Sequence, residues 1–262
     1  MNYYFLTFCI LLLLFSPVCL AKDCLYIAHR GDIDDAPEES YAAVDMAIEN
    51  GYRAIECDVW KTTSEEYLVF HDSDLYKLCG VKKDISEVST KTRTDYPYKN
   101  TKYGIQYILT FSEMLAYAKE NEIDAFFHLK AGKVHFTKDD LRKMQETIDE
   151  EEMHNNAYLF SSDPETVKNM NGTITNFRGG LNIRKNPDSL KIYADRIKNE
   201  HNCNFVIFRY TPGKTDDPDL VDYCHKLWLK VCYYNIDDKE DTRRLKTIGA
   251  DMLILNKPVF VE

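Results

Sequence analysis

The sequence predicts an α/β fold, namely a single (β/α)8 barrel (a TIM barrel) with a loop insertion after its second strand. Short β-rich runs alternate with helical patterns along most of the 262 residues. Eight such strand-helix units follow residue 21, and strands joined by helices pair in parallel. Polar residues suited to catalysis stand at the predicted strand ends, where barrel enzymes carry their active sites.

The first two strands have clear boundary signals. We expect a strand at residues 25–29 that ends near Gly31, and a helix at 40–50 with small apolar residues on one face. Gly51 ends this helix, as glycine often does at a helix C-terminus. The second strand is predicted at residues 53–59.

The chain then leaves the barrel pattern. Residues 67–71 are β-rich, but they follow the second strand too closely for a helical crossover. We therefore expect a loop excursion there rather than a barrel strand. Residues 73–109 are polar, contain Gly80, Pro97 and Gly104, and are predicted to form a long insertion, a length of loop that usually has a function.

The remaining units follow regularly. Thr110-Phe111-Ser112-Glu113 is a capping box that begins a helix running to about residue 120. Further strands are predicted at residues 124–130, 157–160, 180–184, 205–210, 230–236 and 251–255, and further helices at 138–152, from 162, 189–200, 217–227 and 238–248.

Residues 1–21 differ from the rest and predict a signal peptide. The run from Phe5 to Phe15 is uncharged and apolar, and small residues precede a cleavage site after Ala21. This run is short for a bilayer span, so we expect a cleaved signal and a secreted or otherwise extracytoplasmic protein. An uncleaved signal-anchor is the alternative, because residues 1–4 carry no Lys or Arg. The mature domain would be residues 22–262, and no other segment is apolar enough to span a membrane.

The net charge bears on the kind of partner, and the cysteines bear on possible disulfide bonds. The formal net charge is −10, and positive and negative residues are interspersed along the chain. This charge argues against nucleic acid as a partner.

Six cysteines remain after cleavage, and in an oxidising compartment they permit 15 disulfide connectivities. Cys57 lies between Glu56 and Asp58, so strand alternation points it away from them, and we predict a buried free thiol. The six are Cys24, Cys57, Cys79, Cys203, Cys224 and Cys232.

Glu56 and Asp58 are the first candidate site residues. They lie two apart on one predicted strand, so both side chains face the same side. Adjacent carboxylates repel unless a cation lies between them, and such oxygen ligands suit Mg²⁺ or Ca²⁺. The alternative is a structural role in which they form salt bridges with Arg30 or Lys130.

Two histidines accompany this pair. His29 ends the first predicted strand and His71 follows the excursion, and imidazoles suit acid–base catalysis near neutral pH. Arg30 and Lys130 can neutralise a phosphate or act as counter-ions for the carboxylates. Trp60 lies on the same face of the predicted strand as Glu56 and Asp58. It either lines a pocket or is buried against the insertion.

These motifs resemble those of the glycerophosphodiester phosphodiesterases, over almost the whole mature chain. That family carries HRG, PEN-T, E-x-D-V and HD-x-x-L, followed by IEIK, WTVN and a late T-D. Here the matching residues are His29-Arg30-Gly31, Pro37-Glu38-Glu39-Ser40, Glu56-Cys57-Asp58-Val59, His71-Asp72 with Leu75, Phe127–Lys130, Tyr234–Asp237 and Leu255-Asn256. The resemblance implies a (β/α)8 barrel with the HD segment in an insertion after strand two.

The resemblance also implies roles. It assigns His29 and His71 as catalytic acid and base without saying which is which. Glu56 and Asp58 would ligate a divalent metal, with His128 at the place of the family's third metal-ligating glutamate. Substrate and phosphate contacts would come from Arg30, Glu38, Lys130 and Tyr234. The metal would be Mg²⁺ or Ca²⁺ by resemblance, whereas a nitrogen ligand from His128 opens the site to Mn²⁺ or Zn²⁺.

Other departures from the family lie at functional positions. Glu39 replaces the asparagine of PEN, Asp237 the asparagine of WTVN, and Asn256 the late aspartate. We expect a secreted, metal-dependent phosphodiesterase that hydrolyses glycerophosphodiesters to glycerol phosphate and an alcohol. Its small-molecule substrate would be a glycerophosphodiester or a lysolipid. The alternatives are a phospholipase D-type activity on lysolipids or sphingomyelin, and a catalytically impaired secreted binding protein.

Overall fold

The computed structural model describes residues 24–33, 36–99, 102–130, 132–171, 173, 180–183 and 189–261. The predicted signal peptide, residues 1–21, lies outside them, so its existence and cleavage stay predictions. Within the described ranges, none of the helices combines the length and the apolar character needed to cross a bilayer.

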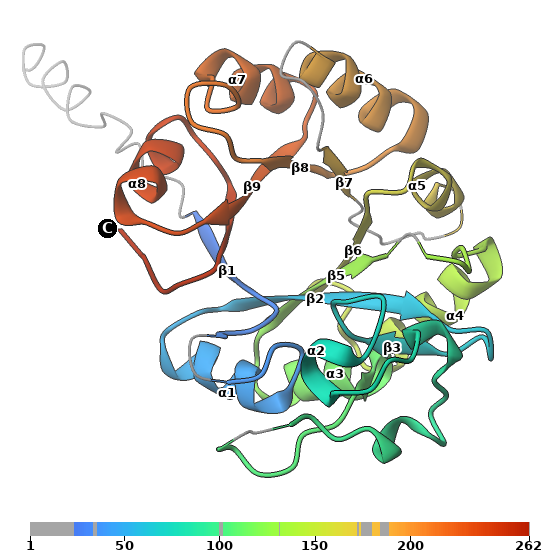
Figure 1. The fold of residues 1–262 in the computed structure, drawn as a ribbon. Helices are drawn as coiled ribbons and strands as arrows, with labels where there is room; N and C mark the ends of the chain where they lie inside the picture. The colour runs from blue at the N-terminus through green and yellow to red at the C-terminus, as the bar shows by residue number, and fades with distance from the viewer. Residues whose placement is uncertain are drawn as a thin grey trace, which may run out of the picture.

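Eight parallel strands form a closed ring (Figure 1). Each strand pairs in parallel with its neighbours, and β1 pairs with both β2 and β10, which closes the sheet on itself. The ring consists of β1 (Leu25–His29), β2 (Ala54–Lys61), β5 (Asp124–Leu129), β6 (Ala157–Ser161), β7 (Gly180–Ile183), β8 (Phe205–Arg209), β9 (Lys230–Ile236) and β10 (Met252–Leu255). The predicted barrel fold is therefore confirmed.

Helices surround the ring, and side-chain caps set where several of them begin (Figure 1). They are α1 (Tyr41–Glu49), α3 (Phe111–Glu120), α4 (Lys138–Glu150), α5 (Pro164–Met170), α6 (Leu190–His201), α7 (Pro218–Lys226) and α8 (Lys239–Thr247). Thr110 and Glu113 form the predicted capping box of α3, and Ser40 caps α1. These caps satisfy backbone N–H groups that have no partner inside the helix. The predicted helices match to within one or two residues at most ends.

Strand alternation divides the side chains into two layers. Ile55, Cys57 and Val59 pack outward into the core between strands and helices. Ala54 packs inward with a second cluster that fills the barrel. Glu56 and Asp58 lie on the same face of β2 as Ala54. They therefore share one face, as predicted, and the structure shows that this face is the barrel interior. Cys57 is a buried free thiol, as predicted, and the other five described cysteines form no disulfide either.

Residues 62–110 form the insertion after β2. The strands β3 (Tyr67–Val69) and β4 (Leu109–Thr110) extend β2 as antiparallel neighbours outside the ring. Between them lie α2 (Tyr76–Cys79) and two 3₁₀ turns, Ile85–Glu87 and Arg93–Asp95. The expectation that 67–71 is not a barrel strand is confirmed.

The insertion is more than the polar loop that its sequence suggests, because it has a hydrophobic core of its own. Leu68, Phe70, Leu75 and Ile108 are fully buried in that cluster together with Trp60. These apolar residues are irregularly spaced, so no helical or strand period reveals them, yet the fold brings them together. Of the two alternatives for Trp60, the structure shows burial against the insertion.

Candidate active site

A polar cavity opens at the C-terminal ends of the barrel strands. The cavity has a volume of about 80 Å³, which is room for several water molecules or a phosphate group. Its wall is formed by His29, Arg30, Glu56, Asp58, His71, His128, Lys130, Phe160, Ile207, Tyr234, Asn235 and Ile254. Eight of the nine predicted site residues therefore meet in one place, and Glu38 is the exception.

A tight turn after β1 places His29 and Arg30 at the cavity. Arg30 and Gly31 both have left-handed backbones, with φ of 61° and 81°. A Cβ atom on Gly31 would lie 2.6 Å from the Cβ of Ala43 and 2.8 Å from its backbone. Only glycine therefore lets α1 pack this closely against the turn.

The protonation of His29 follows from its partners. The Nδ2 of Asn256 donates to Asp237 at 2.7 Å, so the amide Oδ1 faces His29 Nδ1, 2.5 Å away. Because this oxygen only accepts, Nδ1 carries the proton and Nε2 is the basic nitrogen, 3.8 Å from Glu56 Oε2. Burial and the charge of Arg30 lower the pKa of His29 to about 4. His29 is therefore neutral at neutral pH.

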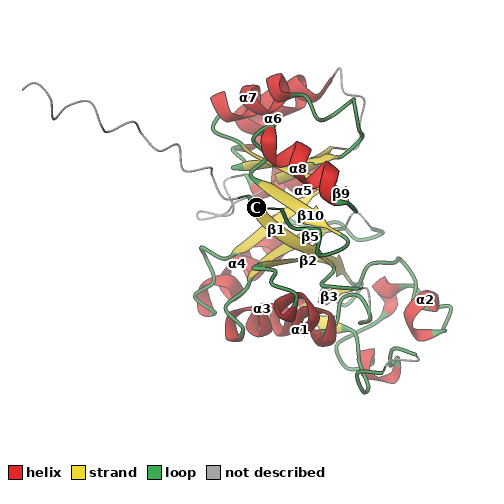
Figure 2. Cartoon of the chain, turned by 90° about the vertical axis from the view of Figure 1, so that its left-hand side faces the viewer, coloured by secondary structure: helices red, strands yellow, loops and turns green. Residues whose placement is uncertain are grey.

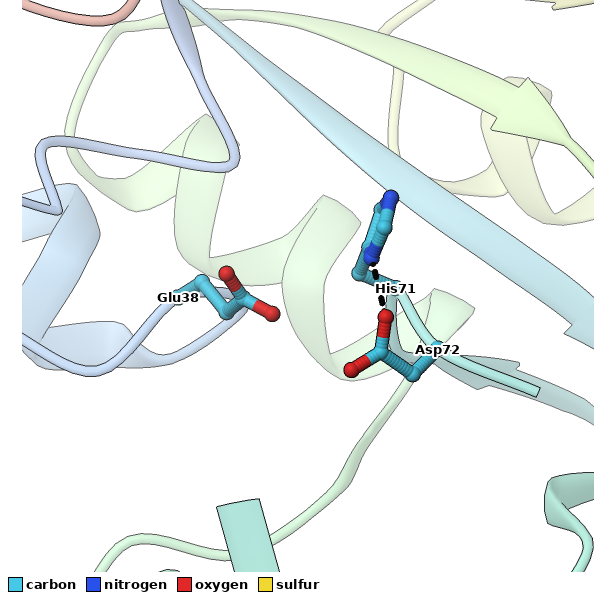
Figure 3. Close-up of side chains that lie close together, drawn as sticks. All are labelled: Glu38, His71 and Asp72. Carbon is cyan, nitrogen blue, oxygen red and sulfur yellow. Dashed lines mark hydrogen bonds and ion pairs between the residues drawn. The ribbon is translucent and has the colours of Figure 1, made fainter. Parts of the chain in front are cut away.

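His71 reaches the same cavity from the loop after β3. Its Nδ1 lies 2.6 Å from Asp72 Oδ1 (Figure 3), and its Nε2 lies 3.8 Å from Asp58 Oδ2. Burial lowers the pKa of His71, while the charge of Asp58 opposes that shift. Unlike His29, this imidazole is held by a carboxylate, which also opposes the lowering of its pKa.

The two carboxylates on β2 are almost completely buried but differ in environment. Burial alone raises the pKa of Asp58, but the hydrogen bond with His128 (2.8 Å) and the charge of Lys130 (3.2 Å) lower it below its ordinary value. Burial and the charge of Asp58 raise the pKa of Glu56 well above its ordinary value. The Oε2 atom of Glu56 is buried without a hydrogen-bond partner.

Glu56, Asp58 and His128 form a candidate metal site. One ligand atom from each lies within 4.8 Å of the others, and all three residues are buried. The ring of His128 stacks on Phe160 with 4.8 Å between centroids, which fixes its orientation. A cation here would receive the unpartnered oxygen of Glu56 and relieve the repulsion from Asp58, so these residues fit a divalent ion.

Glu38 lies behind the cavity rather than in its wall. It accepts from Arg30 Nη1 at 3.1 Å and from Lys77 Nζ at 2.9 Å. It also lies near His71 and Asp72 (Figure 3). This geometry makes Glu38 a counter-ion that orients Arg30, and its predicted contact with substrate stays a prediction.

Two further residues were not among the predicted site residues. Glu39 is fully buried and accepts from the backbone N–H of Asp58 at 2.9 Å. Burial and the charges of Asp58 and Glu56 raise its pKa well above its ordinary value. Asn256 holds His29, as described above. In the sequence, the only sign of either residue was its departure from the family pattern.

Comparisons with known proteins agree with this geometry. A sequence model of the glycerophosphoryl diester phosphodiesterase family matches residues 29–259. A glycerophosphodiester phosphodiesterase from Caldanaerobacter subterraneus is 25% identical over 240 residues, which cover 89% of this chain and 94% of the relative. Human glycerophosphodiester phosphodiesterase 1 is 28% identical over 159 residues, or 56% of this chain and 45% of the relative.

Solved structures share the fold. A glycerophosphodiester phosphodiesterase from Agrobacterium tumefaciens superposes with a TM-score of 0.74 at 18% identity, covering 90% of this chain and 98% of that one. An Oleispira antarctica phosphodiesterase in complex with the product sn-glycerol-3-phosphate superposes with a TM-score of 0.73 at 17% identity, covering 89% and 93%. With the family match across the barrel, this chain belongs to the glycerophosphoryl diester phosphodiesterase family.

Proposed function

We propose that this protein hydrolyses glycerophosphodiesters to a glycerol phosphate and an alcohol in a metal-dependent reaction. The observation that carries the proposal is the cavity itself, in which two imidazoles flank a buried carboxylate pair beside two cationic side chains. Membership of the family and the activities named for its relatives support the same reaction.

Arg30 and Lys130 provide the anion-binding part of the site. Both line the cavity, and both are oriented by acidic partners, Glu38 at 3.1 Å and Asp58 at 3.2 Å respectively. A phosphodiester carries one negative charge, which grows on its oxygens as the nucleophile attacks. Preorganised cations stabilise that charge without reorganising during the reaction.

The environments of the two histidines support distinct roles. His29 is neutral with Nε2 unprotonated, so it fits the general base that takes a proton from water or from a substrate hydroxyl. His71 lies beside the carboxylates of Asp72 and Asp58, which oppose the lowering of its pKa by burial, and it fits the general acid. In hydrolysis a bond from the water oxygen to phosphorus forms, the bond to the alcohol oxygen breaks, and His71 protonates the departing alcohol.

Glu56, Asp58 and His128 would hold the metal. A divalent ion there would polarise the phosphoryl oxygen as a Lewis acid. Glu39 supports this centre by accepting from the N–H of Asp58, which fixes the backbone that presents the carboxylate.

Secretion is proposed on the sequence of residues 1–21. The described thiols are compatible with an oxidising compartment, because five of the six are buried. Burial also raises the pKa of Cys203 and of Cys224 to about 12, which suppresses the reactive thiolate. Expression of the full chain in a secreting host tests the proposal. Mass spectrometry of the medium should find a chain beginning at Lys22, whereas a cell-retained chain beginning at Met1 contradicts it.

The activity is tested with glycerophosphocholine and with a lysolipid, each assayed with chelator and then with Mg²⁺, Ca²⁺, Mn²⁺ and Zn²⁺. Glycerol phosphate from glycerophosphocholine, and acylglycerol phosphate from the lysolipid, should appear only with metal, and the double variant H29A/H71A is the inactive control. Turnover that persists in chelator rejects metal dependence. Absence of turnover on every diester with every metal rejects the enzyme and favours the binding-protein alternative.

A further inference from the structure

The insertion exposes apolar side chains in addition to those in its core. Five large apolar residues are exposed in the described part of the chain, and three belong to the insertion: Tyr76 at 55%, Val81 at 41% and Ile105 at 70%. The other two, Ile192 and Trp228, belong to different parts of the barrel periphery.

Backbone hydrogen bonds join the segments that carry Tyr76 and Ile105. Lys99 donates from its backbone N to Leu78 O at 2.8 Å, and Tyr98 donates from its backbone N to Gln106 O at 2.8 Å. These bonds tie the segment that includes Ile105 to α2, the helix that begins at Tyr76. The three apolar side chains therefore belong to one small, tied unit.

The same unit is basic in an acidic protein. Residues 73–109 contain seven Lys and Arg against four Asp and Glu, whereas the whole chain has a net charge of −10. Lys82 and Lys99 are exposed, and their Nζ atoms lie 5.8 and 5.5 Å from the centroid of the Tyr76 ring. An aromatic ring beside two ammonium groups suits the headgroup level of a membrane, where Tyr and Lys are both favoured.

This surface adjoins the active site. The insertion follows the C-terminal end of β2, the end at which the cavity opens, and Figure 2 shows α2 standing out beyond the barrel there. A groove beside α2 includes Asp72, the partner of His71. Its other lining residues are Ser73, Asp74, Tyr76, Lys77, Lys82, Lys83 and Asp84. Lys77 also contacts Glu38, which holds Arg30 at the cavity.

We propose that the insertion docks this protein on an anionic lipid surface, with Tyr76, Val81 and Ile105 entering the interface and Lys82 and Lys99 facing lipid phosphates. Charge complementarity selects this partner, because a basic patch on an acidic protein is attracted to anionic lipid while the remaining surface is repelled. Docking would present the cavity to diesters held in the membrane, such as lysolipids; this consequence rests on the proposed function, whereas docking itself does not.

Vesicle co-sedimentation of the protein beginning at Lys22 tests the docking. Vesicles of phosphatidylcholine with phosphatidylglycerol should bind it, with affinity falling as salt rises, and vesicles of phosphatidylcholine alone should bind it at least about tenfold more weakly. The variant K82E/K99E should lose at least about fivefold per lysine. The variant Y76S/V81S/I105S should lose at least about tenfold, because buried apolar area contributes to interfacial binding.

Two matched control variants test whether vesicle binding depends on this surface rather than on any exposed apolar or basic residue. I192S/W228S removes the other exposed apolar residues, and K143E/K226E reverses two exposed lysines on α4 and α7. Both should bind like the unmodified protein. All variants should keep their melting temperature and their turnover of soluble glycerophosphocholine, since none of these residues lines the cavity.

Each outcome decides between the two proposals. Docking is rejected if the unmodified protein does not bind anionic vesicles, or if both insertion variants bind them as well as the unmodified protein does. Either result counts against docking even if soluble diesters are hydrolysed. Equal binding to neutral and anionic vesicles rejects the role of the lysines. Anionic binding without hydrolysis of any diester supports docking and rejects the proposed function instead.

Discussion

Asn256 donates a hydrogen bond to Asp237 at 2.7 Å while its carbonyl oxygen faces His29. The glycerophosphodiester phosphodiesterase pattern has the reverse pair, with asparagine at the position of Asp237 and aspartate at that of Asn256. The two departures that seemed unrelated in the sequence are therefore a reciprocal exchange between residues in contact. Its consequence is chemical, because His29 is held here by a neutral amide instead of a carboxylate.

The exchange predicts a pattern of loss and rescue. N256D alone places two carboxylates side by side and should cost about 1 kcal/mol or more of stability, as expected when a partly exposed hydrogen bond becomes a like-charge contact. N256D/D237N restores a complementary pair and should recover most of the melting temperature. Thermal melts of the two variants and of D237N measure this, and equal melting of the single and double variants would contradict the pairing.

The double variant should also change the pH profile. A carboxylate at position 256 stabilises the imidazolium form of His29 and should raise its pKa by about 1–3 units. Since the base must be neutral, the acidic limb of kcat/KM should move to higher pH. An acidic limb that stays in place while the double variant folds normally shows that His29 is not the base.

The two histidines should differ in their dependence on the leaving group. H29A and H71A should each lower turnover of glycerophosphocholine by roughly 10²–10⁴-fold, with an unchanged melting curve. A nitrophenyl phosphodiester needs little protonation of its leaving group, so it should rescue H71A but not H29A. Rescue of H29A alone would reverse the assignment, and near-full activity of both variants would remove both histidines from the mechanism.

His128 should influence metal preference. A nitrogen ligand beside Glu56 and Asp58 favours borderline ions such as Mn²⁺ or Zn²⁺, and H128E should shift preference toward Mg²⁺ or Ca²⁺ by adding a hard oxygen. Metal titrations of activity and of melting temperature measure the shift. Identical preference in both proteins would reject ligation by His128.

His29 should make stability depend on pH. Its pKa falls from an ordinary 6.5 to about 4 in the folded protein, so between these values the unfolded state binds more protons. This contribution is fully present above pH 6.5 and is lost as pH falls through about 4, by up to about 3 kcal/mol. Melting temperatures at pH 7 and pH 4.5 should differ less in H29Q than in the unmodified protein, whereas the exposed-histidine control H154Q should behave like the unmodified protein.

Much of the architecture was determined by the sequence alone. Barrel strands and capped helices follow from local patterns, and Glu56 and Asp58 share one face because side chains alternate along a strand. Those inferences need only neighbours along the chain. The motifs shared with the family, such as His71-Asp72, predicted membership in the same way, and the family match confirms it.

Only the tertiary structure decided the rest. Asn256 and His29 are 227 positions apart, and no local period links them. In the sequence, Glu39 is one acidic residue among others in a charged loop. In the fold it is buried and accepts a hydrogen bond from the backbone N–H of Asp58. The insertion reads as polar because its apolar residues are scattered along the chain, and they form a core only when β3 and β4 bring them together. In each case the deciding contact joins residues that are not neighbours in the sequence, so its energy leaves no trace in any local pattern.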